Sequence, residues 1–222
     1  MSRLIFVGLI TEGATDIRFL ESIIKRTLDE LAFDCRGQIE TELYPFKINK
    51  TGLSFVEQVK RASELGFHDY GLSILCVHTD ADNALQRILD TKIIPAREAM
   101  NIMSASTHCK TIVYIVPVQM IESWMLADKD LFRAEINSDF SDDRLEINLH
   151  PETLSDPKQT IENAIRIARA DLTKRQRGKG ISISDLYQIL GQKVELRSLD
   201  NLPSFIKFKD ELKNALREIN CL

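Results

Sequence analysis

The sequence Leu4-Ile-Phe-Val-Gly-Leu-Ile10, with the turn Thr11-Glu12-Gly13 after it, decides the fold. A short, continuous apolar run of this kind is typical of a β-strand that is buried on both faces, as in parallel sheets. The apolar residues after the turn are three or four positions apart, which predicts an amphipathic helix. They are Ile17, Leu20, Ile24, Leu28 and Leu31. The chain therefore opens with a strand, a tight turn and a helix.

The same order is repeated along the first 130 residues. Further apolar segments predict strands at residues 39–48, 72–77 and 111–118. Helical periods separate them, and we expect the helix over 55–65 to end at Gly66. Alternating strands and helices indicate an α/β fold with a mostly parallel, Rossmann-like sheet and helices on both faces.

The pattern changes after residue 133. An acidic loop, a helix, a basic loop and a terminal amphipathic helix follow one another without a further strand. We therefore predict two parts, an α/β catalytic core over residues 1–133 and a helical C-terminal extension over 134–222 that packs on the core. A chain of 222 residues is long enough for this arrangement.

The composition excludes several classes of protein. With 44% hydrophobic and 28% charged residues, the chain has the ordinary composition of a globular domain. The four cysteines lack CxxC spacing, which favours reduced thiols over a disulfide framework or a zinc site. No apolar stretch approaches about 18 residues, so we expect a cytoplasmic protein without a membrane span. The net charge of −4 means that any contact with nucleic acid depends on local basic patches.

Acidic residues follow the predicted strands. Glu12 ends the first strand, Asp80 and Asp82 come after the strand over 72–77, and Glu122 follows the strand over 111–118. Asp16 lies one turn into the first helix, on the same side as Glu12. In parallel sheets ligands bind beyond the carboxyl ends of the strands, where these residues are expected to meet. Carboxylates packed together repel unless a cation offsets them, and Mg²⁺ or Mn²⁺ prefers such oxygen ligands.

Each of these residues also has a structural explanation. Asp16 and Glu122 could stabilise the first turn of a helix, where carboxylates are favourable. Asp82 could be an N-cap, and His78 could be a hydrogen-bonded structural histidine. The combination is more informative than its members, because an acid after the first strand and an Asp-x-Asp pair after a later one are hard to explain as coincident caps.

Two motifs carry a resemblance to a known family. Ile10-Thr-Glu12-Gly-Ala-Thr-Asp16 before a helix, and Leu75-Cys-Val-His-Thr-Asp80-Ala-Asp82, resemble the Toprim domain of topoisomerases, DnaG-type primases and overcoming-lysogenization-defect (OLD) nucleases. The resemblance implies that Glu12 is a general acid/base and a metal-site residue. It also implies that Asp80 and Asp82 hold Mg²⁺ for phosphoryl transfer and that Asp16 assists.

The spacing of Glu12 and Asp16 resembles the OLD branch in particular, which implies a further acid at Glu122. The segments 116–128 and 156–158 are similar to small bacterial Toprim-like proteins that are often encoded beside AAA/ABC-type ATPases in antiphage loci. OLD-type nucleases also use a late lysine, for which Lys158 and Lys179 are the candidates. The ATPase half is absent from this chain, so the resemblance implies that a partner supplies it.

These observations lead to three functional hypotheses. The first is a Mg²⁺- or Mn²⁺-dependent nuclease or phosphodiesterase, an antiviral defence effector that acts on DNA or RNA. In it, a basic loop would hold the phosphate backbone through Lys174, Arg175, Arg177 and Lys179, a run that is also compatible with a solvated loop. The second is a non-catalytic subunit that binds metal or phosphate and regulates an ATPase partner. The third is an enzyme acting on small phosphorylated substrates.

Overall fold

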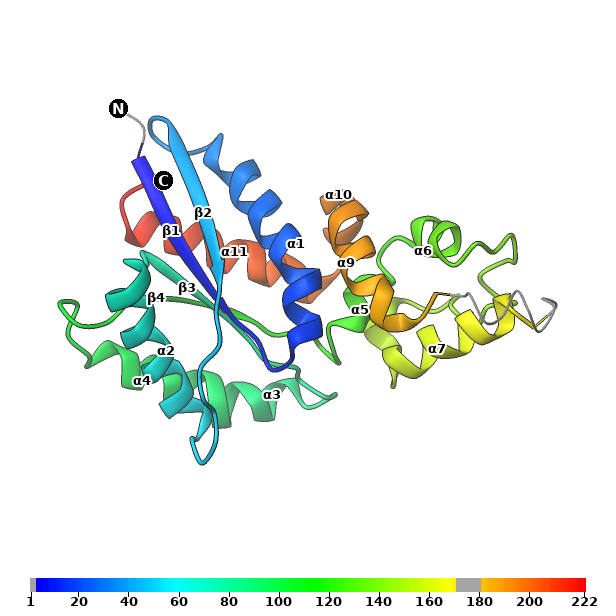
Figure 1. The fold of residues 1–222 in the computed structure, drawn as a ribbon, viewed down its shortest axis with the longest axis horizontal. Helices are drawn as coiled ribbons and strands as arrows, with labels where there is room; N and C mark the ends of the chain where they lie inside the picture. Colours follow the sequence, from blue (N-terminus) through cyan, green and yellow to red (C-terminus); the bar gives the residue numbers. More distant parts are fainter. Residues whose placement is uncertain (1–2, 171–180) are drawn as a thin grey trace.

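In a computed structural model, which describes residues 3–170 and 181–222, an open parallel sheet lies between two layers of helices (Figure 1). The strand order is β2-β1-β3-β4, and every neighbouring pair is parallel. The strands are β1 (Arg3–Ile10), β2 (Ile39–Pro45), β3 (Ile74–His78) and β4 (Thr111–Ile115). The predicted α/β class with a parallel sheet is confirmed.

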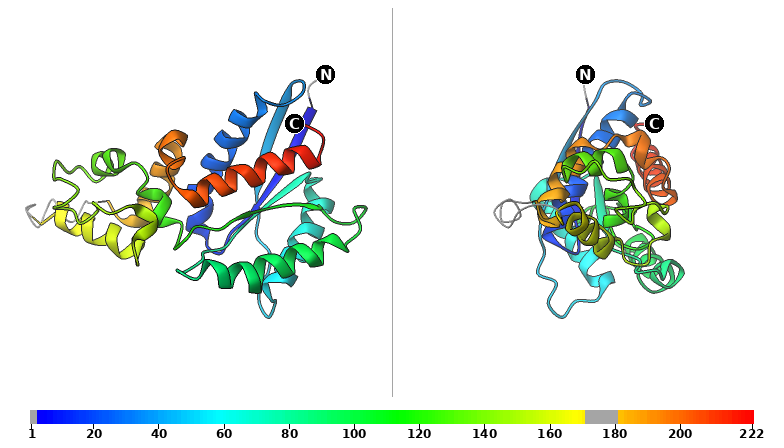
Figure 2. Two further views of the ribbon diagram at one scale, coloured as in Figure 1. Left: turned by 180° about the vertical axis from the view of Figure 1, so that it is seen from behind. Right: turned by 90° about the vertical axis from the view of Figure 1, so that its right-hand side faces the viewer.

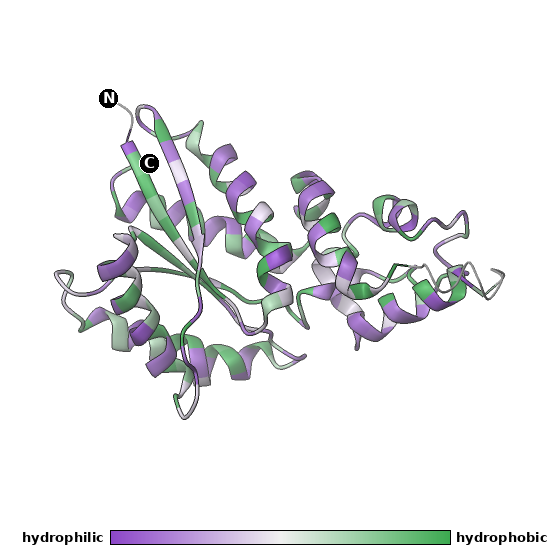
Figure 3. Cartoon of the chain, in the orientation of Figure 1, coloured by the Kyte–Doolittle hydropathy of each residue, from purple (hydrophilic) through white to green (hydrophobic). Residues whose placement is uncertain are grey.

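The central strand β1 is buried because its side chains alternate between two hydrophobic clusters. Ile5, Val7 and Leu9 belong to the cluster on one face of the sheet, and Ile10 belongs to the cluster on the other. Figure 3 shows β1 as almost continuously hydrophobic, whereas β2 at the edge mixes polar and apolar residues. The continuous apolar run in the sequence thus marks a strand covered on both sides.

Each face of the sheet has its own helices (Figure 2). On one face lie α1 (Ala14–Ala32) and α11 (Pro203–Glu218), whose apolar sides join the Ile5 cluster. On the other face lie α2 (Phe55–Tyr70) and a continuous run of α3 (Leu85–Ile88), the π-helical segment η1 (Leu89–Ile93) and α4 (Ile94–Asn101). A π turn within a helix is uncommon. Where one is present, it frequently lies at a functional site.

The prediction that Gly66 ends a helix is wrong. Helix α2 continues to Tyr70 and ends at Gly71, which has a positive φ of 62°. Gly66 instead makes room for the Leu72 side chain, because a Cβ at this position would lie 2.4 Å from Leu72 Cδ1. A glycine within a helix can serve close packing, and the sequence pattern does not distinguish the two uses.

The remaining helices extend away from the sheet (Figure 1). They are α5 (Glu122–Met125), α6 (Lys129–Glu135), η2 (Pro151–Thr153), α7 (Pro157–Ala168), α9 (Ile183–Lys193) and α10 (Leu196–Leu199). Helix α9 crosses α1 so closely at Gly191 that a Cβ there would lie 2.5 Å from the Phe19 carbonyl oxygen. Arg26 of α1 locks the crossing by donating to the carbonyls of Gly191 and Val194, at 2.6 Å each. These hydrogen bonds fix α9 against α1.

The chain then returns to the sheet, where α11 lies along β4. Glu211 of α11 accepts a hydrogen bond from the Tyr114 amide of β4, at 3.4 Å. Residues before and after position 133 share one hydrophobic cluster, which includes Trp124, Phe205 and Phe208. Within residues 3–170 and 181–222, no helix has both the length and the apolarity needed to cross a membrane.

Candidate functional site at the switch point of the sheet

The strand order places a crevice between the carboxyl ends of β1 and β3. The chain leaves β1 toward β2 on one side and later crosses over to β3 on the other side. Connections that diverge in this way open a binding site at the topological switch point. Glu12 follows β1 there, and Thr79 and Asp80 follow β3. The Thr79 hydroxyl donates a 2.5 Å hydrogen bond to Glu12 Oε1, so the structure brings the two predicted acidic segments together.

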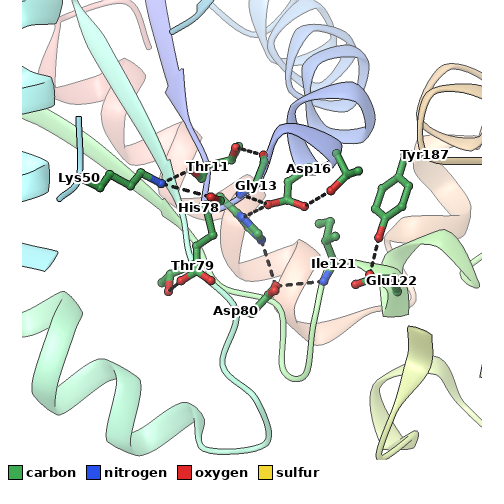
Figure 4. Close-up of polar contacts among 12 residues, drawn as sticks. Thr11, Gly13, Asp16, Lys50, His78, Thr79, Asp80, Ile121, Glu122 and Tyr187 are labelled. Atoms are coloured by element: carbon green, nitrogen blue, oxygen red, sulfur yellow. Dashed lines mark hydrogen bonds and ion pairs between the residues drawn. The ribbon is translucent and has the colours of Figure 1, made fainter. Parts of the chain in front are cut away.

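The residues at the end of β3 point to opposite faces. Side chains alternate between the two faces of a strand, so the His78 ring faces the same side as Ile74 and Cys76, toward the α1 layer. Thr79, the next residue, faces the α3–α4 layer. Figure 4 shows the His78 ring between the carboxylates of Asp16 and Asp80. Its Nδ1 lies 3.6 Å from Asp16 Oδ2 and its Nε2 lies 3.2 Å from Asp80 Oδ1. The residue is only 2% exposed.

The contacts of His78 with the two carboxylates are ionic. Neither ring nitrogen makes a hydrogen bond of regular geometry to the described residues. Burial alone would lower the pKa of His78, but Asp16 and Asp80 outweigh it and raise this pKa from 6.5 to about 9. The two carboxylates thus favour the protonated ring, which links helix α1 to the end of β3.

Stability is expected to depend on this charge. The pKa of His78 is higher in the folded protein than in the unfolded chain, so its stabilisation is complete below pH 6.5 and is lost as the pH rises through about 9. At about 1.4 kcal/mol for each pKa unit, the free energy of unfolding should fall by about 3 kcal/mol across this window. Urea unfolding at pH 6.5 and 9.5 measures the fall. In His78→Leu it should largely vanish, and an equal fall in that variant would contradict the assignment.

Asp16 has structural partners besides His78. It is the third residue of α1, and its Oδ2 accepts a hydrogen bond from the Gly13 amide at 2.8 Å. Its Oδ1 accepts one from the Thr15 hydroxyl at 3.2 Å. Burial would raise the pKa of Asp16, but His78, Gly13 and Thr15 together lower it. Asp16 thus serves the start of the helix, as the structural explanation expected, and also fixes His78.

Asp80 and Asp82 lie in different surroundings. Asp80 Oδ1 accepts a hydrogen bond from the Ile121 amide at 3.1 Å, which ties the end of β3 to the segment after β4. Asp82 is exposed in a turn with a positive φ of 46°, and its amide donates to the Gln119 carbonyl at 2.9 Å. The N-cap of the next helix is Ala84, so Asp82 does not cap it.

Glu122 is buried, at 5% exposure, and receives a hydrogen bond from the Tyr187 hydroxyl of α9 (Figure 4). Burial is the main cause that raises the pKa of Glu122. Asp80 adds to this effect, and Tyr187 and Lys158 oppose it. Figure 4 shows Glu122 on the side of the crevice that faces Tyr187.

Two lysines complete the crevice, and the sequence analysis missed both. Lys92 of the π-helical segment η1 donates to the Thr79 hydroxyl at 2.8 Å and lies 3.4 Å from Glu12 Oε1. Its Nζ is also 5.5 Å from the centre of the Phe55 ring. Lys50, in the loop after β2, donates to the Thr11 carbonyl and lies 3.4 Å from the Glu12 carbonyl. Burial lowers the pKa of Lys50, and Glu12 and Asp16 oppose this effect.

Of the two lysine candidates implied by the resemblance, the structure describes Lys158. Lys158 is exposed in the first turn of α7, which begins with Asp156 as the N-cap and Pro157 as the first residue. The Asp-Pro-Lys segment therefore has a structural explanation as a helix start. The basic loop, with Lys174, Arg175, Arg177 and Lys179, falls outside the described residues.

Three basic side chains lie beside the carboxylates of the crevice. The carboxylates of Glu12, Asp16 and Asp80 are offset by His78, Lys50 and Lys92. The premise that only a divalent cation could offset these carboxylates was therefore incomplete, because the sequence pattern did not place the three protein cations. Among residues 3–170 and 181–222, no three His, Cys, Asp or Glu side chains converge in a geometry that could hold a metal ion.

A magnesium ion does not need three protein ligands. It usually keeps several water molecules and is held by one or two carboxylates together with substrate phosphates. Asp80 Oδ2 and Glu12 Oε2 receive no hydrogen bond from the part of the chain that the structure describes. Asp80 and Glu12 each keep one oxygen for such a role, whereas both oxygens of Asp16 are already engaged.

A cavity of about 290 Å³ adjoins Glu12. It lies between the start of α1 and the loop after β2, and its walls combine polar and apolar side chains. Those walls include Gly13, Ile17, Ile48 and Lys50. The cavity provides room for a chemical group next to the carboxylate.

Comparison of the chain with protein-family models, curated proteins and solved structures gives no match. The resemblance to the Toprim domain therefore depends on the two motifs and on the expected fold class.

Proposed function

We propose that the protein hydrolyses phosphodiester bonds of nucleic acid with the help of Mg²⁺ or Mn²⁺. One observation carries the proposal: Glu12 after β1, Thr79 and Asp80 after β3, and Lys92 of the π turn meet at the switch point of a parallel sheet. The Glu12 carboxylate is suited to proton transfer, and the lysine beside it is suited to stabilisation of negative charge.

Each residue has a distinct role in this proposal. Asp80 and Glu12 would hold the cation, which when bound polarises a phosphate and lowers the pKa of a water molecule. Glu12 exchanges a proton with the attacking or leaving oxygen, and the Thr79 hydroxyl fixes its carboxylate for that purpose. Lys92 places positive charge where the phosphate gains negative charge. The cavity next to Glu12 receives the nucleoside that adjoins the reacting phosphate.

A second candidate function is favoured by the charge balance of the crevice. His78, Lys50 and Lys92 lie beside the carboxylates, and such a site suits a non-catalytic subunit that binds metal or phosphate and regulates an ATPase partner. The AAA/ABC-type partner, the antiphage role and the cytoplasmic location are all predictions from the sequence.

Metal-dependent turnover separates the two functions. Purified protein should cleave plasmid DNA or tRNA in Mn²⁺, and the activity should vanish in EDTA and in Asp80→Ala. The Asp69→Ala variant is a matched control, because Asp69 is exposed in the last turn of α2. A chromogenic phosphodiester tests for a small substrate. Absence of cleavage from all three substrates, together with an intact fold, would favour the regulatory subunit.

A further inference from the structure

A separate cavity, of about 210 Å³, adjoins the edge strand β4. The run from α3 to α4 bounds it on one side and α11 bounds it on the other, and these elements flank β4 in Figure 2. Among the described residues, its lining has no member in common with that of the cavity beside Glu12. It is therefore a second site, apart from the acidic crevice.

Most of the walls of this cavity are apolar. Segment η1, helices α4 and α11 and the residue after β4 provide them through Leu89, Ile93, Ile94, Val116 and Phe208. An apolar cavity of about 150 Å³ is large enough to bind benzene, so the volume here suits one six-membered ring with small substituents. The rings of Phe208 and Tyr114 line the cavity and favour an aromatic ligand, because aromatic pairs attract one another beyond the effect of buried area.

Two polar groups of the lining are without a partner. The other polar side chains of the lining are engaged within the protein, in the pairs Gln86–Asp90, Ser204–Glu152 and Arg97–Glu211. The Tyr114 hydroxyl makes no hydrogen bond with the described residues. The Lys207 ammonium group likewise makes no hydrogen bond or ion pair with that part of the chain.

The two free groups differ in burial. Tyr114 is only 4% exposed, and a buried hydroxyl without a partner is costly, so this group favours a ligand that can form a hydrogen bond with it. Burial raises the pKa of Tyr114, which keeps the hydroxyl protonated and able to donate. Lys207 is exposed and marks the open end of the cavity. Because Arg97 and Glu211 offset each other, the charge of Lys207 is left for an anionic group.

We propose that this cavity binds a small aromatic acid with a hydroxyl group on its ring, of the type of 4-hydroxybenzoate. The ring packs between Phe208 and the aliphatic walls, its hydroxyl group pairs with the Tyr114 hydroxyl, and its carboxylate lies beside Lys207. Sites for small molecules usually have this character, with mostly apolar walls and a few polar groups that fix the orientation of the ligand. The inference does not depend on the proposed function.

Isothermal titration calorimetry of the intact protein with 4-hydroxybenzoate tests the proposal. A ligand of this size in a fitting cavity should bind with a dissociation constant below about 1 mM. Benzoate lacks the ring hydroxyl and should bind about fivefold more weakly, the usual effect of one hydrogen bond. Tyr114→Phe should bind 4-hydroxybenzoate about fivefold more weakly than the wild type does, and should bind benzoate within about twofold of the wild-type affinity.

The charge at the open end has its own test. Lys207→Met should weaken binding of 4-hydroxybenzoate by about threefold at low salt, as expected for an exposed ion pair, and the difference should shrink as salt is added. Lys213→Met is the matched control, because Lys213 also belongs to α11 but does not line the cavity. It should bind the ligand as the wild type does.

Two results would overturn the proposal. One is a folded wild-type protein that shows no saturable binding of 4-hydroxybenzoate. The other is binding that Tyr114→Phe leaves unchanged or weakens equally for both ligands, since the ring hydroxyl would then not pair with Tyr114. The melting temperature of each variant checks its fold. If Tyr114→Phe does not fold, the comparison of Lys207→Met with Lys213→Met decides, and equal affinities of these two variants would contradict the site.

Discussion

The Glu12→Gln variant is expected to cleave phosphodiesters at least about 100-fold more slowly than the wild-type protein, because general acid–base catalysis contributes a factor of this size or more. Glutamine retains an oxygen that accepts hydrogen bonds from Thr79 and Lys92, so the geometry of the crevice should persist. What the substitution removes is the ability to exchange a proton. The single-turnover rate in saturating Mn²⁺ measures the loss.

A matched control for this variant is Glu21→Gln. Glu21 is an exposed residue of α1 and does not contact Thr79 or Lys92. The Glu21→Gln variant should cleave at the wild-type rate. Both variants should keep the wild-type melting temperature within about two degrees. Wild-type turnover by Glu12→Gln would remove this residue from the mechanism.

The Lys92→Met variant is expected to reduce the rate by about 10² to 10³, the usual effect of removing one group that stabilises charge in the transition state. Methionine keeps much of the apolar stem beside Phe55 and loses the ammonium group beside Glu12 and Thr79. The effect should appear in kcat rather than in KM, because the ammonium group acts on charge that develops during the reaction.

Lys158→Met is the decisive comparison for Lys92. Lys158 is one of the two lysines that the family resemblance implied, and it is exposed at the start of α7. We expect this variant to retain the wild-type rate within about twofold. If Lys158→Met loses activity and Lys92→Met does not, the catalytic lysine is Lys158, as the family resemblance implies, and the contacts in the crevice do not identify it.

The fold could be predicted from the sequence because its dominant signal is local. Strands buried on both faces appear as apolar runs, and the amphipathic helices between them show a period of three to four residues. Glu12 and Asp80 could also be predicted, since the carboxyl ends of parallel strands meet in space. Gly66 could not be interpreted correctly, because its role depends on Leu72, which packs against it from beyond the end of the helix.

The cations of the crevice could not be predicted for a different reason. Lys92 reaches Glu12 and Thr79 from a π turn, which has no sequence signature and which shifts the direction of the side chains that follow. Lys50 lies in a loop whose path depends on tertiary contacts. The pattern indicates a structural histidine at His78, but one of its two carboxylate partners, Asp16, lies on an element that is distant in the sequence.

One measurement tests most directly whether Glu12 and Lys92 act together at a single reaction centre. It is the single-turnover rate of Glu12→Gln/Lys92→Met beside both single variants, in saturating Mn²⁺. Groups that act as a unit are strongly non-additive, so the account predicts that the double variant is within about threefold of the slower single variant. A double-variant rate that is reduced by the product of the two separate losses would contradict joint action of Glu12 and Lys92. A wild-type protein without metal-dependent turnover would also contradict it.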